Sequence, residues 1–293
     1  VERSRGLGDV YKRQLLSYVE AKGEDDLVDW VRARVTFPCS MVDRITPRST
    51  PALVNEANSL FGGRSTSPIH SEDYIQWVLE DRFAGPMPDL AVAGVELVED
   101  VDPYEEAKIR ILNGGHTGLA YLGALAGHST FDEAMRNAAL RRHFDGLEKE
   151  EVLPGIAMDL PFDRHAYCER IAERFANRAI ADALERICMD GFAKFPIFLR
   201  PTLEGCLTSG ITPRYCYLSI ASWYVYARRH ASQQVSVPYH EPNWHLLEPM
   251  LEAGQEMVFA GSQLLWGDLP DRFPDFAAAI VNSIQEIDQR WPV

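Results

Sequence analysis

The sequence predicts an α+β fold in which a short α/β segment precedes a larger, mostly helical domain. Two observations lead to this prediction. Strand-like stretches occur at 35–38, 74–81 and 95–98, whereas from residue 106 onward the apolar residues follow helical spacing interrupted by proline and glycine. A chain of 293 residues is also long enough for two ordinary domains. We therefore expect an α/β part over 15–104 and an all-α domain over 105–293.

Each element of the first part rests on a local pattern. Apolar residues at helical spacing predict a helix over 15–34, and a short strand at 35–38 is expected to stop at its proline. A second helix is expected over 51–60. The stretch 74–81 is apolar enough for a buried strand, and 95–98 alternates between apolar and polar residues, as a strand does.

The second part opens where Asp102-Pro103 begins a long helix, because proline is well tolerated in a first helical turn. Roughly seven to nine helices are expected from residue 106 onward, given the spacing of proline and glycine. Those with the clearest patterns are expected at 131–147, 164–175, 179–194 and 215–229.

Composition and charge exclude several classes of protein. A net charge of −14 would repel phosphate backbones, so nucleic acid is not an expected partner. No apolar run of about 18 residues is present, and the start of the chain lacks a secretory pattern. Five cysteines, an odd number without a C-x-x-C pair, indicate buried thiols in a reducing compartment. These features predict a cytoplasmic protein that is a monomer or a weak oligomer and has no membrane contact.

Candidate chemistry centres on the stretch from Lys108 to His116. If this stretch is helical, Lys108 shares an apolar stripe, with His116 about 80° to its side and Asn113 about 140° round. Burial lowers the pKa of a lysine and makes it a usable general base, while Asn113 and His116 could hold a reacting oxygen. The alternative is a core helix with a snorkelling lysine and a hydrogen-bonded histidine. The stripe consists of Ile111, Leu112, Leu119 and Leu122.

The stretch 108–123, KIRILNGGHTGLAYLG, resembles the signature of the mannitol dehydrogenase family, which includes fructuronate and tagaturonate reductases. The resemblance implies that Lys108 is the general base or acid, that Asn113 and His116 hold the substrate oxygen, and that no metal takes part. It also implies a Rossmann-type first domain and a second domain similar to the C-terminal domain of 6-phosphogluconate dehydrogenase.

Two further stretches are similar to family motifs. FPCSMVDRITP at 37–47 implies that Asp43 lies near the substrate, where the alternative is an aspartate in a turn. RICMDGFAKFP at 186–196 implies that Arg186 and Lys194 line the polyol site, where the alternative is a salt-bridged surface stripe with Asp190.

The sequence departs from the family pattern in several places. Cys39 stands where the family usually has asparagine, and Phe192 replaces a serine, which could alter substrate choice. Gly6-Leu7-Gly8 does not form a dinucleotide fingerprint, so the cofactor-binding residues are unknown. A family asparagine upstream is missing as well. We expect residues 1–14 to be a non-native leader on a shortened chain.

Together these features predict an NAD- or NADP-dependent oxidoreductase that interconverts a mannitol-like polyol and a fructose-like ketose. A hexuronate reductase of the same family, acting on the fructuronate/mannonate pair, is one alternative. An inactive helical scaffold that lacks the cofactor domain is another. His240, Glu241 and His245 do not match the H-E-x-x-H zinc pattern, because the spacing is one residue too long and a proline intervenes.

Overall fold

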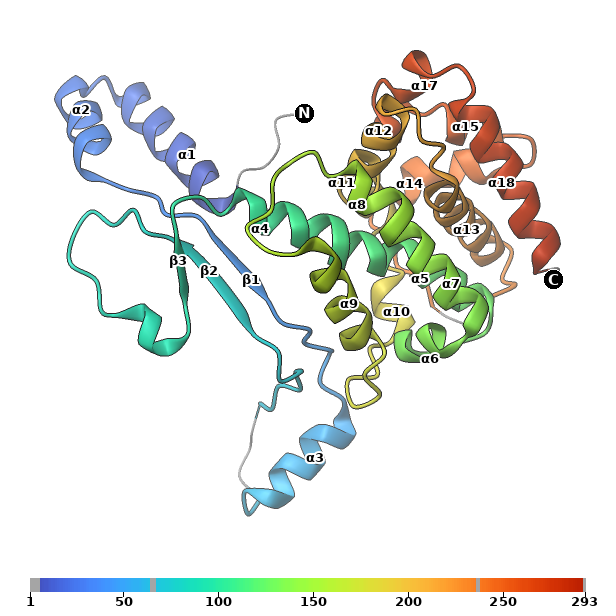
Figure 1. Cartoon of the computed structure of the whole chain (residues 1–293), viewed down its shortest axis with the longest axis horizontal. Coiled ribbons are helices and arrows are strands. Elements are labelled where there is room, and N and C mark those ends of the chain that lie inside the picture. Colours follow the sequence, from blue (N-terminus) through green and yellow to red (C-terminus); the bar gives the residue numbers. More distant parts are fainter. Residues whose placement is uncertain (1–5, 64–66, 236–237, 292–293) are drawn as a thin grey trace. The chain divides into compact units, whose positions relative to one another are not determined.

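The computed structural model describes residues 6–63, 67–235 and 238–291 (Figure 1). The chain divides into two compact units, one formed by 1–46 and 69–106 and the other by 47–68 and 107–293. The first unit contains a small sheet and the second is helical, which confirms the predicted fold class. Among the residues predicted to be a leader, 1–5 lie outside the described part of the chain.

The first unit opens with a helical hairpin. Helix α1 covers Gly6–Lys22 and α2 covers Asp25–Arg34, and they pack against each other. Gly23, with a left-handed φ of 72°, separates them. The helical character predicted for 15–34 is confirmed, although a glycine turn divides the span and the first helix already begins at Gly6.

Three short strands form the sheet, in the order β1-β2-β3 (Figure 1). Strand β1 (Ser40–Asp43) runs antiparallel to β2 (Gln76–Glu80), and β2 runs parallel to β3 (Glu96–Val98). The strands predicted at 74–81 and 95–98 are confirmed.

The strand predicted at 35–38 is wrong, because pairing begins only beyond Pro38, which has no N–H to donate. Cys39 is the first residue to bond with β2. Its N–H donates to the Glu80 carboxylate at 2.8 Å, and its carbonyl accepts from the Glu80 N–H at 3.0 Å.

The core of the first unit is small. Cys39, Met41, Val78 and Val101 are buried together, with Val98 and Tyr104 packed against them. The opposite face of the sheet is apolar but exposed, because Val42 is 54% exposed, Trp77 40% and Leu97 39%. A 3₁₀ turn, η1 (Leu90–Ala93), leads into β3.

The second unit includes α3 (Pro51–Leu60), which confirms the helix predicted over 51–60. Thr50 caps it, since its hydroxyl accepts the Leu53 N–H at 3.2 Å, and Pro51 occupies the first turn.

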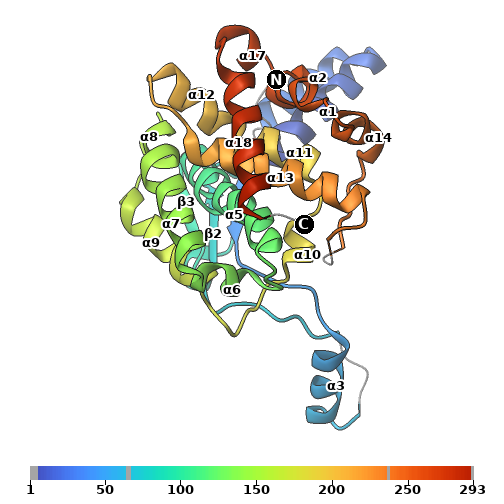
Figure 2. The ribbon, with the colours of Figure 1, turned by 90° about the vertical axis from the view of Figure 1, so that its right-hand side faces the viewer.

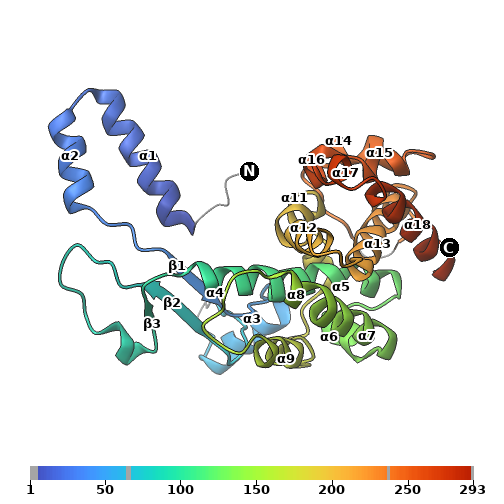
Figure 3. The same ribbon diagram turned by 45° about the horizontal axis from the view of Figure 1, so that its top comes forward.

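The predicted helix from Asp102 is continuous to Leu125 but changes its winding (Figure 3). It runs as α4 (Asp102–Ala107), then η2 (Lys108–Asn113), a π-helix, then α5 (Gly114–Leu125). Helix α5 is buried nearly all round rather than along one stripe, because it packs against α7 (Ala138–Gly146), α10 (Leu184–Ile187) and α13 (Arg214–Ala231). Helix α18 (Phe276–Arg290) covers α13 (Figure 2).

The described part of the second unit contains more and shorter helices than the seven to nine expected. The helix predicted over 131–147 is divided at Asn137, whose side chain accepts the N–H groups of Ala139 and Leu140 and so starts a new helix. The remaining elements are α6 (Phe131–Arg136), η3 (Leu147–Val152, a π-helix), α8 (Leu153–Gly155), α9 (Arg164–Phe175), α11 (Gly191–Phe198), α12 (Arg200–Thr208), α14 (Trp244–Leu247), η4 (Glu248–Leu251), α15 (Glu256–Ala260), α16 (Gln263–Trp266) and α17 (Leu269–Arg272).

The single helix predicted over 179–194 is also wrong. Asp190, with a left-handed φ of 57°, separates α10 from α11, and Pro196 lies inside α11 instead of ending a helix. Gly191, directly after the break, packs closely against two other helices: a Cβ there would lie 2.4 Å from Trp223 Nε1 and 2.8 Å from the Tyr121 hydroxyl.

Candidate active site

The predicted base and its neighbours lie in a π-helical turn. Lys108 opens η2 and Asn113 closes it, and the Gly114 N–H bonds back to the Ile109 carbonyl, five residues earlier. This winding adds a residue to the turn, so the angles predicted at about 100° per residue do not hold across it. Lys108 and Asn113 are half-buried. Single π turns inside α-helices occur frequently at functional sites.

A buried arginine within the same turn ties it to the neighbouring helices. Arg110 is 2% exposed, its Nε donates to the Thr202 hydroxyl at 3.0 Å, and its Nη2 donates to the Gly155 carbonyl at 3.2 Å. The turn is thereby fixed to α12 and to the end of α8. The sequence analysis assigned Arg110 no role.

A second unforeseen residue packs behind the helix. Glu148, on η3, is fully buried, and a Cβ at Gly115 would lie 2.3 Å from its Oε1. Burial raises the pKa of Glu148 well above its usual range, against the opposing charge of Arg110. At Gly115, the glycine pair of the motif therefore leaves room for the Glu148 side chain against the helix backbone.

His116 is held by aromatic rings. Its imidazole stacks on Phe175 with ring centroids 4.7 Å apart and meets the edge of Phe131 at 4.4 Å. Its Nε2 lies 3.9 Å from Oδ2 of Asp182. Burial lowers the pKa of His116 to about 3; Asp182 opposes this shift, and nearby cations add to it. The imidazole is therefore neutral near pH 7, with one N–H to donate and one nitrogen to accept. The cations are Arg186, Lys194 and Arg174.

Arg186 and Lys194 approach this histidine from the third motif. Arg186 binds Asp182 with two donors, Nε at 2.7 Å from Oδ1 and Nη2 on Oδ2. Lys194 Nζ donates to the Ile187 carbonyl at 3.0 Å, and burial lowers the pKa of this lysine. The predicted alternative, a stripe on one helix face with Asp190, fails because the helix is broken at Asp190.

A buried hydrogen-bond network fixes the N-terminus of α11, the helix that contains Lys194. The Glu241 carboxylate accepts the Phe192 N–H and the Tyr239 hydroxyl, each at 2.9 Å, and Trp223 Nε1 donates to Tyr239 at 2.8 Å. Phe192, which stands where the family usually has serine, is half-buried.

The structure thus gathers Asp182, Arg186 and Lys194 around His116, and Lys108 and Asn113 lie on the same helix as His116. Asp182 was missed by the sequence analysis. Its signal was its position four residues before Arg186, the spacing of a helical ion pair. Asp43 belongs to the first unit, where it ends β1 with a side chain that is 2% exposed, and no turn forms there.

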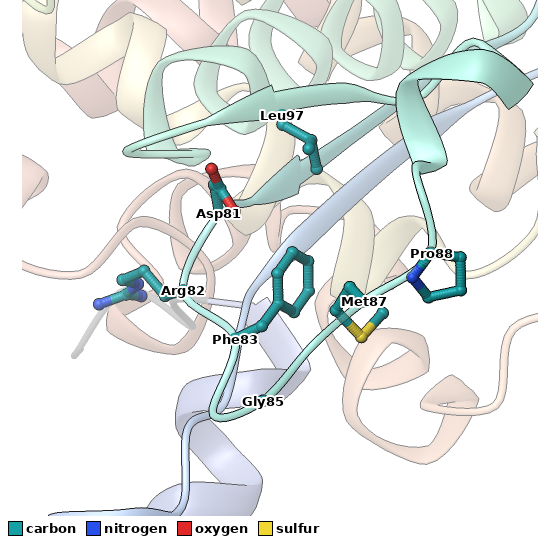
Figure 4. Close-up of a pocket in the computed structure, with 7 residues that line it drawn as sticks. All are labelled: Asp81, Arg82, Phe83, Gly85, Met87, Pro88 and Leu97. Atoms are coloured by element: carbon teal, nitrogen blue, oxygen red, sulfur yellow. The ribbon is translucent and has the colours of Figure 1, made fainter.

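An open hollow of about 410 Å³ lies elsewhere in the first unit, beside the loop after β2 (Figure 4). None of the predicted site residues lines it; its lining consists of Asp81, Arg82, Phe83, Gly85, Met87, Pro88 and Leu97. Among the described residues, no three His, Cys, Asp or Glu side chains group as a metal site would require. No described helix combines the length and the apolar character needed to cross a bilayer.

Two protein-family models match the chain. The family model for the mannitol dehydrogenase C-terminal domain matches residues 100–288, and that for the mannitol dehydrogenase Rossmann domain matches residues 2–92. The chain belongs to the mannitol dehydrogenase family. The Rossmann-domain match includes residues 2–14; the expectation that residues 1–14 are a leader stays a prediction.

Relatives within the mannitol dehydrogenase family act on several substrates. The chain is 32% identical to D-arabinitol 4-dehydrogenase of Klebsiella pneumoniae over 96% of its own length and 62% of the relative's. It is 32% identical to D-mannonate oxidoreductase of Escherichia coli K12 over 97% of its length and 59% of the relative's.

One solved member of the family is the ternary complex of Pseudomonas fluorescens mannitol 2-dehydrogenase with NAD and D-mannitol. It superimposes on 98% of the chain with a TM-score of 0.85 and 32% identity, and 58% of its own length is covered. The chain therefore spans about three-fifths of these relatives.

Proposed function

We propose that this chain carries the substrate site of an NAD- or NADP-dependent oxidoreductase that interconverts a mannitol-like polyol and a fructose-like ketose. The observation that carries the proposal is the grouping of His116, Arg186 and Lys194 in the unit that also holds Lys108 and Asn113. These residues come from two separate family motifs.

Each residue has a defined task in this proposal. In the oxidation direction, Lys108 accepts the proton of the substrate hydroxyl, and Asn113 donates its amide N–H to the developing alkoxide. The neutral imidazole of His116 orients the same oxygen. Arg186 and Lys194 donate to the distal hydroxyls. Asp43, in the first unit, stays a substrate-binding residue predicted from its motif.

A nicotinamide dinucleotide would take or give the hydride when bound. Gly6 and Gly8 lie within helix α1 rather than in a turn after a strand, so they do not form a phosphate-binding loop. We therefore assign no described residue to the dinucleotide, and the choice between NAD and NADP stays open.

The test follows oxidation of NADH and NADPH with fructose, using this chain and any longer product of its gene. Lys108→Ala should lower kcat/KM roughly 100-fold or more, since general acid–base catalysis contributes about 10²–10⁴. Lys149→Ala is the matched control, because Lys149 is an exposed lysine paired with Glu169. Equal activity of Lys108→Ala and the wild type would refute the assigned base.

A second candidate is a hexuronate reductase of the same family, which the similarity to D-mannonate oxidoreductase favours. Fructuronate in place of fructose, in the same assay, separates the two. A helical scaffold without activity is the third reading, and it would turn over neither ketose with either cofactor.

A further inference from the structure

A buried aspartate stands among the cations of the site. Asp182 is 5% exposed and lies in the loop between α9 and α10. Its two carboxylate oxygens accept the Nε and Nη2 groups of Arg186. Such a two-point pair fixes the plane of the guanidinium as well as its distance, so Arg186 cannot swing freely toward a substrate.

The backbone holds Asp182 in place independently of Arg186. The Asp182 carbonyl accepts the Phe131 N–H at 2.9 Å, and the Leu184 N–H donates to the Ser129 carbonyl at 3.0 Å. Ala181, just before it, takes a left-handed φ of 43°, which a residue other than glycine adopts only when its surroundings impose it. The carboxylate is therefore a built part of the site.

The position of this carboxylate decides what Arg186 can offer. One edge of the guanidinium is occupied, and only the remaining N–H groups can reach a ligand. A ligand oxygen held by Arg186 would therefore lie close to the negative charge of Asp182.

We propose that Asp182 is a positioning residue that determines specificity: by keeping Arg186 ion-paired, it makes the site favour an uncharged CH₂OH end over a carboxylate. This inference rests on the proposed function. Of its two candidate substrate classes, it favours the polyol over the hexuronate. A hydroxyl can accept from the remaining N–H groups of Arg186 without cost. A ligand carboxylate held by Arg186 would meet the like charge of Asp182 at short range.

D-mannitol and D-mannonate suit the test, because they differ only in whether one end carries CH₂OH or a carboxylate. Their dissociation constants are measured by calorimetry on the wild-type chain and on Asp182→Asn, with Asp182→Ser as a second neutral replacement. The control is Asp132→Asn, which removes a buried aspartate from another i,i+4 pair, with Arg136.

We expect the wild type to bind mannitol more tightly than mannonate. Asp182→Asn should shift the ratio of the two constants toward mannonate by roughly tenfold or more, because one negative charge is removed. Asp132→Asn should leave the ratio unchanged. Mere loosening of the site would weaken both ligands alike and would not move the ratio.

The outcomes separate the two proposals. Binding of neither ligand by the wild type would overturn the proposed function, and this inference with it. A wild type that binds mannitol, but binds mannonate equally or better, would overturn only the role of Asp182. An unchanged ratio in whichever neutral variant folds would do the same.

Discussion

At the scale of single residues, burial outweighs nearby charge in setting the protonation of the site. His116 lies beside the carboxylate of Asp182, yet its pKa falls to about 3 because desolvation dominates. A neutral imidazole can donate to the substrate oxygen in one direction of the reaction and accept in the other. This property depends on Phe131 and Phe175, which surround the ring.

The depressed pKa of His116 predicts how stability depends on pH. The unfolded histidine takes up a proton near pH 6.5 and the folded one near 3, so its contribution is complete above pH 6.5 and is lost as the pH falls toward 3. His116→Asn cannot take up this proton. Between pH 7 and pH 4.5, wild type should lose about 2–3 kcal/mol more unfolding free energy than the variant, as measured by urea denaturation.

A second buried histidine, His143, also loses its charge at unusually low pH, because burial lowers its pKa to about 3. Ser219 Oγ lies 3.0 Å from its Nε2. His143 remains in both proteins and therefore cancels in the comparison. Parallel loss of stability in wild type and His116→Asn across this pH range would show that His116 does not titrate as a buried neutral group.

Sequence reasoning at this scale found the residue types but not their partners. Lys108, Asn113, His116, Arg186 and Lys194 stand in motifs with fixed spacing, so they could be named from the sequence. The spacing of Asp182 indicated its pair with Arg186. Its approach to His116 and the contact of Glu148 with the backbone at Gly115 cross the fold, so they could not be predicted from the sequence. No local pattern announces a contact between two distant helices.

At the scale of elements, the two π-helical turns account for much of what the sequence did not predict. The 3.6-residue period gave the existence and extent of the helix from Asp102, but a π turn obeys no apolar period of its own. Likewise, the close packing of Trp223 against Gly191, next to the break at Asp190, is visible only in the packed structure.

The packing of η3 on α5 leads to a prediction for Gly115→Ala. The added methyl would lie 2.3 Å from Glu148 Oε1 and 2.8 Å from Phe144 Cε2, so one of the two elements must shift. Overpacking of this kind costs about 1–3 kcal/mol. Urea denaturation should show this loss in unfolding free energy, whereas Gly85→Ala, where a Cβ meets nothing within 4 Å, should change stability by less than about 1 kcal/mol.

An undiminished stability in Gly115→Ala would mean that Glu148 does not press against the helix backbone. Enzyme activity provides a second measurement on the same variant. A shift of α5 moves His116 and Asn113 together, so kcat should fall even where the protein remains folded.

At the scale of the whole molecule, the two units differ in how much core each has. The first unit buries a small cluster around Cys39, and one face of its sheet leaves Val42, Trp77 and Leu97 exposed. The second unit buries many large side chains, among them Trp223, Trp266, Tyr121 and Phe195. Since stability grows with buried apolar surface, the first unit should open at lower denaturant than the second.

The cysteines report on this difference. All five are buried thiols, with Cys39 in the first unit and Cys168, Cys188, Cys206 and Cys216 in the second. In the native protein none should react rapidly with a thiol reagent, because burial excludes the reagent and raises the pKa of Cys168 and Cys206 to about 12. With rising urea, one thiol should become reactive first and the other four later, in a separate transition. Cys39→Ser should abolish the first phase alone, and release of all five thiols in one step would show instead that the two units unfold together.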